Sequence, residues 1–151
     1  MLESIRIKQR QSKPIRLGDV VDYQGKSFII IRILGFEVLE QEGPETFWCY
    51  YCLGQLYGSK DLASNYVPTL TEQVFELTQL NEVPEPGEIF FDDVINIWVI
   101  VQEIQQICFE DQQIKVTFKF APVPEWPKEK IAKAMQKHRL SRMKLLPKSS
   151  H

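Results

Sequence analysis

Alternation of hydrophobic and polar positions dominates the chain as far as about residue 123. Runs of β-branched and aromatic residues are separated there by turn residues, a pattern typical of short β-strands rather than of helices. We therefore expect a β-rich body, with strands over residues 19–23, 27–34, 36–40, 46–53, 73–78, 88–91, 95–104, 106–110 and 113–120.

A helical period is found only after Pro127. Proline suits the first position of a helix and Glu129 complements the positive end of the helix dipole, so the sequence predicts a helix from residue 128 to about 146. At about 100° per residue, one side of this helix carries Lys130, Lys133, Lys137 and Lys144, and the other carries Ile131, Ala134, Met135, Met143, Leu145 and Leu146. The predicted helix is basic and amphipathic, and we expect Trp126 to anchor it to the body.

The β-rich body contains two similar halves. Gly18-Asp19-Val20 followed by residues 28–31 is matched 69 residues later by Gly87-Glu88-Ile89 followed by residues 97–100. At a spacing of 67, a second match joins Phe47, Cys49, Tyr51 and Leu53 to Ile114, Val116, Phe118 and Phe120. The pattern predicts one supersecondary unit used twice, although two unrelated antiparallel meanders would look alike at this level.

The start of each half is similar to a known kind of fold. Gly18-Asp19-Val20-Val21, followed after a short turn by Lys26-Ser27-Phe28-Ile29-Ile30, resembles the opening strands of small SH3-like barrels of the KOW and Tudor kind. The resemblance implies a module that binds nucleic acid, peptides or modified side chains, more than a catalyst. The expected fold is mainly β, with a basic arm, a first small barrel, a second barrel-like repeat, and a basic helix with its tail, over residues 1–18, 19–83, 84–124 and 125–151.

Charge is sorted by position along the chain. The formal charge is +4 over residues 1–18, −12 over 19–124 and +6 over 125–151, within a total of −2. Because such asymmetry concerns partners more than fold, we expect phosphates of DNA or RNA to be bound by Lys130, Lys133, Lys137, Arg139, Arg142 and Lys144. Other interpretations stay open: the helix docks on an acidic protein or on its own body, lies on an anionic membrane, or exposes an ordinary solvated lysine face.

A candidate protein-binding surface lies around the first predicted hairpin. If Phe47, Cys49, Tyr51 and Leu53 face the core, alternate residues of that strand face outward, beside several acidic side chains. The predicted partner contacts are Trp48, Tyr50, Glu40, Glu42 and Glu45. Two alternatives remain: the aromatic residues are covered by the second half or by the helix, and the acidic residues only keep the sheet edge from pairing.

The motif Trp48-Cys49-Tyr50-Tyr51-Cys52 resembles the thioredoxin redox site, and a cysteine pair at this spacing can supply half of a zinc site. A strand places residues i and i+3 on opposite faces, so we expect Cys49 and Cys52 to face apart. A zinc site would also need two further ligands from Cys108, His138 and His151. A redox or metal function is therefore the third hypothesis, and structural, half-buried cysteines are favoured.

Features of an enzyme are sparse. The seven glycines are scattered and form no phosphate-binding loop, and a general base is hard to place because His138 lies in the predicted helix and His151 ends the sequence. We expect no catalysis, no cofactor and no metal. Three cysteines fit a reducing compartment, and no apolar run approaches the roughly 20 residues of a membrane helix, so we expect a cytoplasmic protein without membrane contact.

Together these patterns favour a non-catalytic adaptor of a nucleic-acid-handling assembly. Its basic ends would contact nucleic acid or a neighbouring subunit, and its acidic and aromatic body would contact a protein. The alternative is a small acidic inhibitor or nucleic-acid mimic, of the kind mobile elements encode, that blocks a DNA- or RNA-binding machine.

Overall fold

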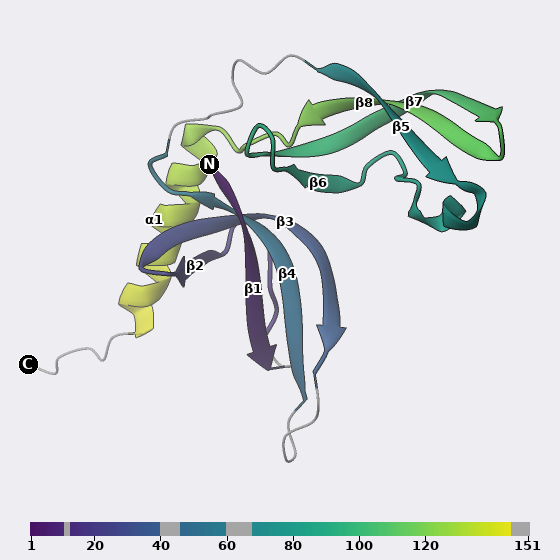
Figure 1. Ribbon diagram of the computed structural model, residues 1–151. Coiled ribbons are helices and arrows are strands. Elements are labelled where there is room, and N and C mark those ends of the chain that lie inside the picture. The colour runs from purple at the N-terminus through teal and green to yellow at the C-terminus, as the bar shows by residue number, and fades with distance from the viewer. Residues whose placement is uncertain (11–12, 40–45, 60–67, 146–151) are drawn as a thin grey trace, which may run out of the picture. The chain divides into compact units, whose positions relative to one another are not determined.

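The computed structural model describes residues 1–10, 13–39, 46–59 and 68–145, without the side chains of Lys144 and Leu145. It divides the chain into two compact units (Figure 1). Unit 1 consists of Met1–Lys60 and Glu125–His151, and unit 2 consists of Asp61–Pro124. Unit 2 is thus an insertion in the sequence of unit 1, and the division differs from the boundary expected after residue 83.

Unit 1 is built on a curled antiparallel sheet in the order β1-β4-β3-β2. Its strands are β1 (Leu2–Arg10), β2 (Val20–Tyr23), β3 (Lys26–Val38) and β4 (Phe47–Leu56). The buried centre on one face of the sheet is formed by Ile5, Phe28, Ile30 and Cys52. Within residues 1–18, where a basic arm was expected, β1 pairs along its length with β4, because Ile5 and Ile7 alternate with basic residues and pack on this core.

Unit 2 repeats the same strand order, as β5-β8-β7-β6. Its elements are β5 (Thr69–Glu76), a 3₁₀ helix (Leu77–Glu82), β6 (Ile89–Asp92), β7 (Ile97–Glu110) and β8 (Gln113–Pro122). Its core centres on Val101, Ile114, Val116 and Phe118. The described residues therefore form a mainly β protein with two curled four-stranded sheets, or half-barrels, consistent with two small tandem barrels.

The two sheets bend at equivalent places. In β3 the pairing with β4 shifts after Ile30 and again after Ile33. In β7 the pairing with β8 shifts after Val101 and again after Ile104. Each shift inserts one extra residue, and such bulges bend a strand and increase its twist. The curl of both sheets follows from these matching irregularities.

The backbone repeats, but two parts of the sequence alignment were wrong. Ile30 of β3 corresponds to Val101 of β7, so these strands match at a spacing of 71 instead of 69. Cys52 lies opposite Ile33 in unit 1, and Phe118 lies opposite Ile104 in unit 2. The equivalent residues of β4 and β8 are therefore 66 apart instead of 67. A slip of one residue moves every side chain of a strand to the other face. Tyr50 and Cys52 therefore meet the core named above in place of the expected set, of which Cys49 and Leu53 are nevertheless buried.

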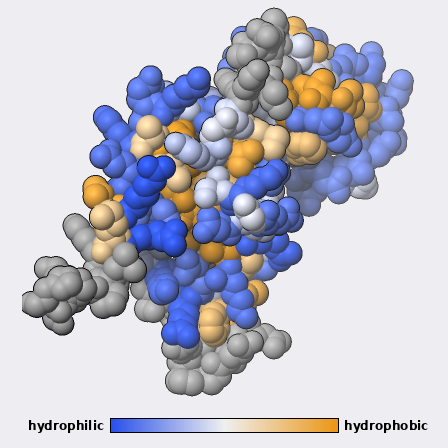
Figure 2. Space-filling view, turned by 90° about the vertical axis from the view of Figure 1, so that its left-hand side faces the viewer, coloured by the Kyte–Doolittle hydropathy of each residue, from blue (hydrophilic) through white to orange (hydrophobic). Residues whose placement is uncertain are grey.

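The single α-helix among the described residues, α1 (Lys128–Leu145), packs against β2 and β3 of unit 1. Ile131 is buried there, whereas Met143, which was expected on the packed side, is 66% exposed. Figure 2, which views the protein from the side on which α1 lies in Figure 1, shows hydrophilic residues over much of that face. The helix thus rests on its own unit through the first half of its length and keeps most of its charges in solvent.

Candidate functional site

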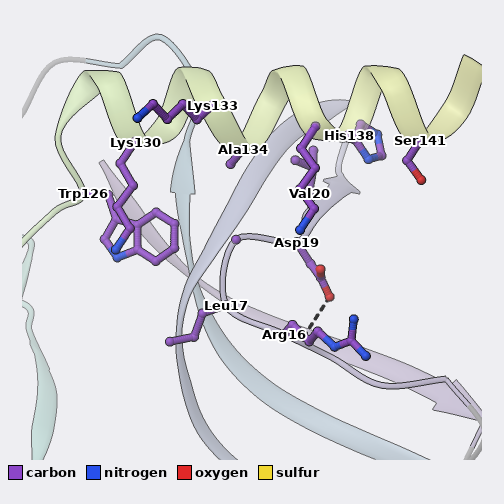
Figure 3. Close-up of a pocket in the computed structure, with 12 residues that line it drawn as sticks. Arg16, Leu17, Asp19, Val20, Trp126, Lys130, Lys133, Ala134, His138 and Ser141 are labelled. Atoms are coloured by element: carbon purple, nitrogen blue, oxygen red, sulfur yellow. Dashed lines mark hydrogen bonds between the residues drawn. The ribbon is translucent and has the colours of Figure 1, made fainter.

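A basic hollow lies between α1 and the segment that leads into β2 (Figure 3). Its volume is about 400 Å³ and all of its walls belong to unit 1. We call it the hollow; it is lined by Arg16, Leu17, Gly18, Asp19, Val20, Trp126, Lys130, Lys133, Ala134, Lys137, His138 and Ser141. One wall is therefore a helix face and the other is a tight turn of the chain.

Helical periodicity brings the lysines of one wall together. Lys130, Lys133 and Lys137 occupy positions i, i+3 and i+7 of α1, which places them on one side of the helix. We call these three residues the lysine stripe. Ala134 lies between them and is short, so it leaves room in the hollow.

The facing wall is a turn that is held to the sheet by backbone hydrogen bonds. The Gly18 N–H donates to the Ile30 carbonyl at 2.7 Å, and the Ile30 N–H donates to the Asp19 carbonyl at 2.8 Å. Gly18 has φ of +94°, a conformation that favours glycine because it has no Cβ. The Asp19 carboxylate accepts a hydrogen bond from the Arg16 backbone N–H at 2.8 Å, drawn in Figure 3, so Arg16 has a defined place at the rim.

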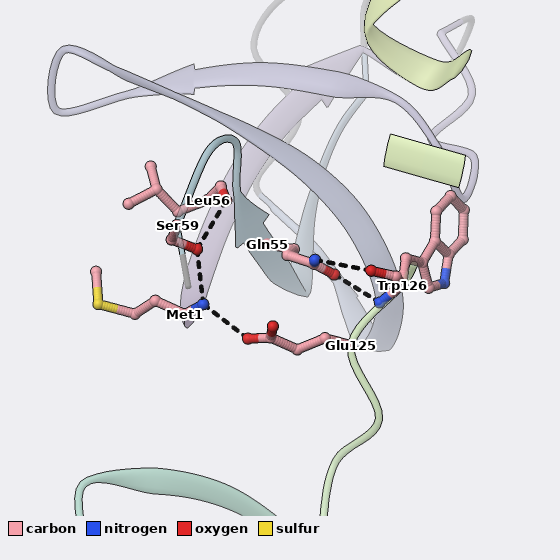
Figure 4. A network of polar contacts seen from close by, with 6 residues as sticks. All are labelled: Met1, Gln55, Leu56, Ser59, Glu125 and Trp126. Carbon is pink, nitrogen blue, oxygen red and sulfur yellow. Dashed lines mark hydrogen bonds and ion pairs between the residues drawn. The ribbon is translucent and has the colours of Figure 1, made fainter. Parts of the chain in front are cut away.

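The start of α1 is fastened to the sheet by a reciprocal pair of hydrogen bonds. The buried Gln55 side chain donates to the Trp126 carbonyl at 3.1 Å and accepts from the Trp126 N–H at 2.7 Å (Figure 4). The Met1 amino group lies 2.7 Å from the Glu125 carboxylate in the same network. A Cβ placed on Gly18 would lie 3.7 Å from the Trp126 ring. Trp126 therefore anchors the helix to the body, as expected, and sets the distance between the two walls.

Positive charge dominates the hollow. The lining contains four cationic side chains, those of Arg16 and the lysine stripe, and one carboxylate, that of Asp19, so its formal charge is +3 with His138 neutral. Lys130 Nζ lies 3.7 Å from the centroid of the Trp126 ring, where the negative face of the indole attracts a cation. The arrangement can attract and hold an anion, because like charges gathered beside a low-dielectric wall reinforce one another.

The six basic residues expected to bind nucleic acid separate into two groups. The lysine stripe lines the hollow, whereas Arg139 and Arg142 are exposed elsewhere on α1. Lys144 lies in the last turn of α1, and its side chain is outside the described part. The sequence had included Arg16 only as one basic residue of the expected N-terminal arm; only the fold shows that the turn after it faces the helix.

The expected protein-binding surface stays a prediction, and the described part of it, Trp48 and Tyr50, is half-buried. Tyr50 packs against the core of unit 1 beside Cys52, and Trp48 stacks at 5.3 Å on Phe36. Trp48 Nε1 is buried without a hydrogen-bond partner among the described residues. Tyr51, expected inside, instead donates to the Glu37 carboxylate, and this hydrogen bond raises the pKa of the Tyr51 phenol. Glu40, Glu42 and Glu45 lie outside the described residues.

The two cysteines of the Cys-x-x-Cys motif face apart, as expected. Cys52 belongs to the core of unit 1, whereas Cys49 interacts with Arg6 on the other face of the sheet. Burial, followed by the proximity of Cys49, raises the pKa of the Cys52 thiol to about 11, which disfavours the reactive thiolate. No group of three metal-ligating side chains occurs in the described ranges. The redox or metal hypothesis therefore gains no support from this motif.

The hollow also brings together Asp19, His138 and Ser141, the residue types of a hydrolytic triad. Among the described residues, no hydrogen bond joins His138 to either of the others, so the geometry supplies no argument for an activated serine. No helix in the described part of the chain is both long and apolar enough to cross a membrane. Comparison of the chain with protein-family models, with curated proteins and with solved structures gave no match.

Proposed function

We propose that the protein is a non-catalytic accessory protein that contacts nucleic acid through unit 1 and a protein partner through the rest of its surface. The observation that carries the proposal is that Arg16 and the lysine stripe all line one hollow. Lysine and arginine side chains neutralise backbone phosphates and release condensed counterions, which supplies most sequence-independent affinity for nucleic acid.

The distribution of charge between the two units supports this division of labour. Both basic ends of the chain belong to unit 1, whose formal charge is +7, whereas unit 2 carries −9. Unit 2 by itself repels phosphates and attracts basic surfaces. Within one protein, the two units therefore suit different partners, nucleic acid for the first and a basic protein for the second.

Charge reversal within α1 tests the nucleic-acid contact. We expect the triple variant Lys130→Glu, Lys133→Glu, Lys137→Glu to lose binding of DNA and RNA, measured by fluorescence anisotropy. The matched control, Lys128→Glu, Arg139→Glu, Arg142→Glu, makes the same change of charge on the same helix outside the hollow, and is expected to keep most of the affinity. For three phosphate contacts on duplex DNA, raising the salt from about 50 to about 200 mM weakens binding roughly 40-fold.

Two results would contradict the proposal. One is that the unmodified protein binds neither DNA nor RNA at the lower salt concentration. The other is that the two triple variants lose the same affinity, which would show that only the net charge of the helix matters.

The acidity of unit 2 favours a second candidate, an acidic inhibitor or nucleic-acid mimic. In that case the charge of −9 on unit 2 would occupy the basic groove of a DNA- or RNA-binding protein. Reversing Glu72, Glu103 and Glu110 to lysine, with the helix left intact, would then abolish capture of the basic partner. Capture that survives these changes would exclude the mimic.

A further inference from the structure

We propose that the hollow of unit 1 is a binding site for a phosphate monoester of nucleotide size. The inference rests on the proposed function. It adds that the ligand enters the hollow and does not contact only the outer side of α1. The chemistry has two natural sources, a free mononucleotide and the phosphorylated end of a single strand. A phosphate within a continuous strand is a diester and is a different ligand.

Charge favours a monoester over a diester. At neutral pH a phosphate monoester carries about −1.5 to −2 charges, because its second pKa is near 6, whereas a backbone diester carries a single charge. The hollow presents a formal charge of +3 from Arg16, the lysine stripe and Asp19. Coulomb attraction scales with the product of the charges, so the doubly charged ester is bound more strongly by the same set of side chains.

The shape of the hollow favours a discrete ligand over a duplex. Its volume of about 400 Å³ lies within the range of roughly 300–1,000 Å³ that is typical of small-molecule sites. It is set between a helix and a turn (Figure 3), and Gln55 and Trp126 hold these walls together from the start of α1. A site with two fixed walls admits a terminal group more readily than the broad, convex backbone of a double helix.

The lining also suits the part of a nucleotide that is not phosphate. Leu17, Val20 and the Trp126 ring give an apolar surface, and the Ser141 hydroxyl and the His138 ring give polar groups that can form hydrogen bonds. Lys130 lies over one face of the Trp126 ring, so an entering phosphate would draw this cation from the indole. A change in tryptophan fluorescence is therefore a direct consequence of binding at this site.

Substitution of Asp19 tests the inference through a gain in affinity, whereas substitution of the basic residues tests it through a loss. Its carboxylate is the one negative group of the lining and opposes the binding of an anion. Asp19→Asn removes that charge but keeps an oxygen that can accept the hydrogen bond from the Arg16 N–H. We expect this variant to bind a phosphate monoester more tightly, by about 3-fold to 10-fold. A gain in affinity is not a result that misfolding can produce.

The experiment titrates the full chain with AMP and, in a separate arm, with a short oligothymidylate that carries either a 5′-phosphate or a 5′-hydroxyl. Calorimetry and tryptophan fluorescence report binding. We expect a preference of at least about 10-fold for the phosphorylated end, as one charge-assisted contact supplies. Arg16→Gln and Lys137→Gln should each weaken the binding of the phosphorylated ligands. Lys128→Gln and Arg139→Gln, on α1 outside the hollow, should leave that binding unchanged.

The outcomes separate this inference from the proposed function. Binding of AMP without any binding of oligonucleotides supports the monoester site, with a free nucleotide as its ligand, and overturns the nucleic-acid proposal. Equal, salt-dependent binding of both oligonucleotides with no response to AMP overturns the monoester site and leaves the nucleic-acid proposal standing. An Asp19→Asn variant that is folded but binds AMP no more tightly also overturns the monoester site.

Discussion

Units 1 and 2 share a backbone plan and differ in almost everything that side chains contribute. Both arrange four strands in one order and bulge the long third strand at two equivalent places. Their formal charges are nevertheless +7 and −9. The difference teaches that strand order and bulge positions specify the half-barrel, whereas the surface is free to diverge toward different partners.

The cores of the two units are filled from different strands. Phe28 and Gly54 of unit 1 correspond to Val99 and Phe120 of unit 2 by their positions in the ladders. Unit 1 thus has a phenylalanine on β3 and a glycine on β4. At the equivalent places unit 2 has a valine on β7 and a phenylalanine on β8. Cores tolerate such exchanges when total volume and patterning are kept.

The opposite face of each sheet differs as well. Gln55 of unit 1, which binds the backbone of Trp126, corresponds to Ala121 of unit 2. Alanine has no side-chain amide with which to hold a neighbouring segment. The capacity to fasten a helix, and with it the hollow, therefore belongs to unit 1 among the described residues.

The largest expected effect on folding stability comes from substitutions at one equivalent ladder position in the two cores. Phe118→Ala in unit 2 should destabilise folding by about 3–5 kcal/mol, because it removes a fully buried ring. Cys52→Ala, at the equivalent place in unit 1, should cost only about 1 kcal/mol because less apolar surface is lost. Urea denaturation measures both. Equal costs would show that the two positions are not equivalent in packing.

The next largest effect on stability is expected at a glycine of β4 in the core of unit 1. A Cβ at Gly54 would lie 2.4 Å from Ile5 Cδ1 and 2.9 Å from Phe28 Cβ, so Gly54→Ala should cost roughly 1–3 kcal/mol through overpacking. Gly35→Ala is the matched control, since a Cβ there meets nothing within 4 Å. It should leave the denaturation midpoint almost unchanged. A tolerated Gly54→Ala would mean that β1 and β3 shift easily, against the tight packing of this core.

A third effect separates the cysteines. With a pKa of about 11, only about one in a thousand Cys52 thiols is ionised at pH 8. Cys52 should therefore resist alkylation in the native protein, whereas Cys108, which is partly exposed in unit 2, should react first. Mass spectrometry of peptides after timed alkylation with iodoacetamide checks the order. Fast labelling of Cys52 at low denaturant would reveal that unit 1 opens locally.

The smallest effect lies at the end of the long hairpin of unit 2. Lys115 Nζ is 2.8 Å from the Glu110 carboxylate and lowers its pKa, first through the hydrogen bond and then through its charge. This contribution to stability is present above the ordinary carboxyl pKa and is lost as the pH falls through the lowered folded value.

Both of these side chains are exposed, so the effect on stability should be barely measurable. In an NMR titration, Lys115→Gln should raise the pKa of Glu110 toward its ordinary value. Unit 1 offers a built-in comparison, because Leu39 and Cys49 occupy the equivalent positions and cannot form such an ion pair. A Glu110 pKa that does not move would show that the contact does not persist in solution.

Much of the fold was visible in the local pattern. The predicted strand breaks at residues 35 and 105 fall where the register of β3 and β7 shifts, so the interruptions in hydrophobicity marked bulges inside two long strands. β1 was not predicted because basic residues stand between its apolar ones. Residues 1–18 were therefore interpreted by their charge, as a basic arm. The inward face of β4 was misassigned because both faces of this strand carry apolar or aromatic residues, so alternation alone does not say which face meets the core.

Sequence alone determined the β-rich body, the helix and the lysine stripe, because these depend on periods of two and 3.6 residues between close neighbours. Only the tertiary structure decided that both basic ends belong to one unit, that the turn at Gly18 faces α1, and that Arg16 joins the lysines. Those facts depend on contacts between residues more than a hundred positions apart, such as that of Met1 with Glu125. Such contacts arise from packing and register, which no local pattern encodes.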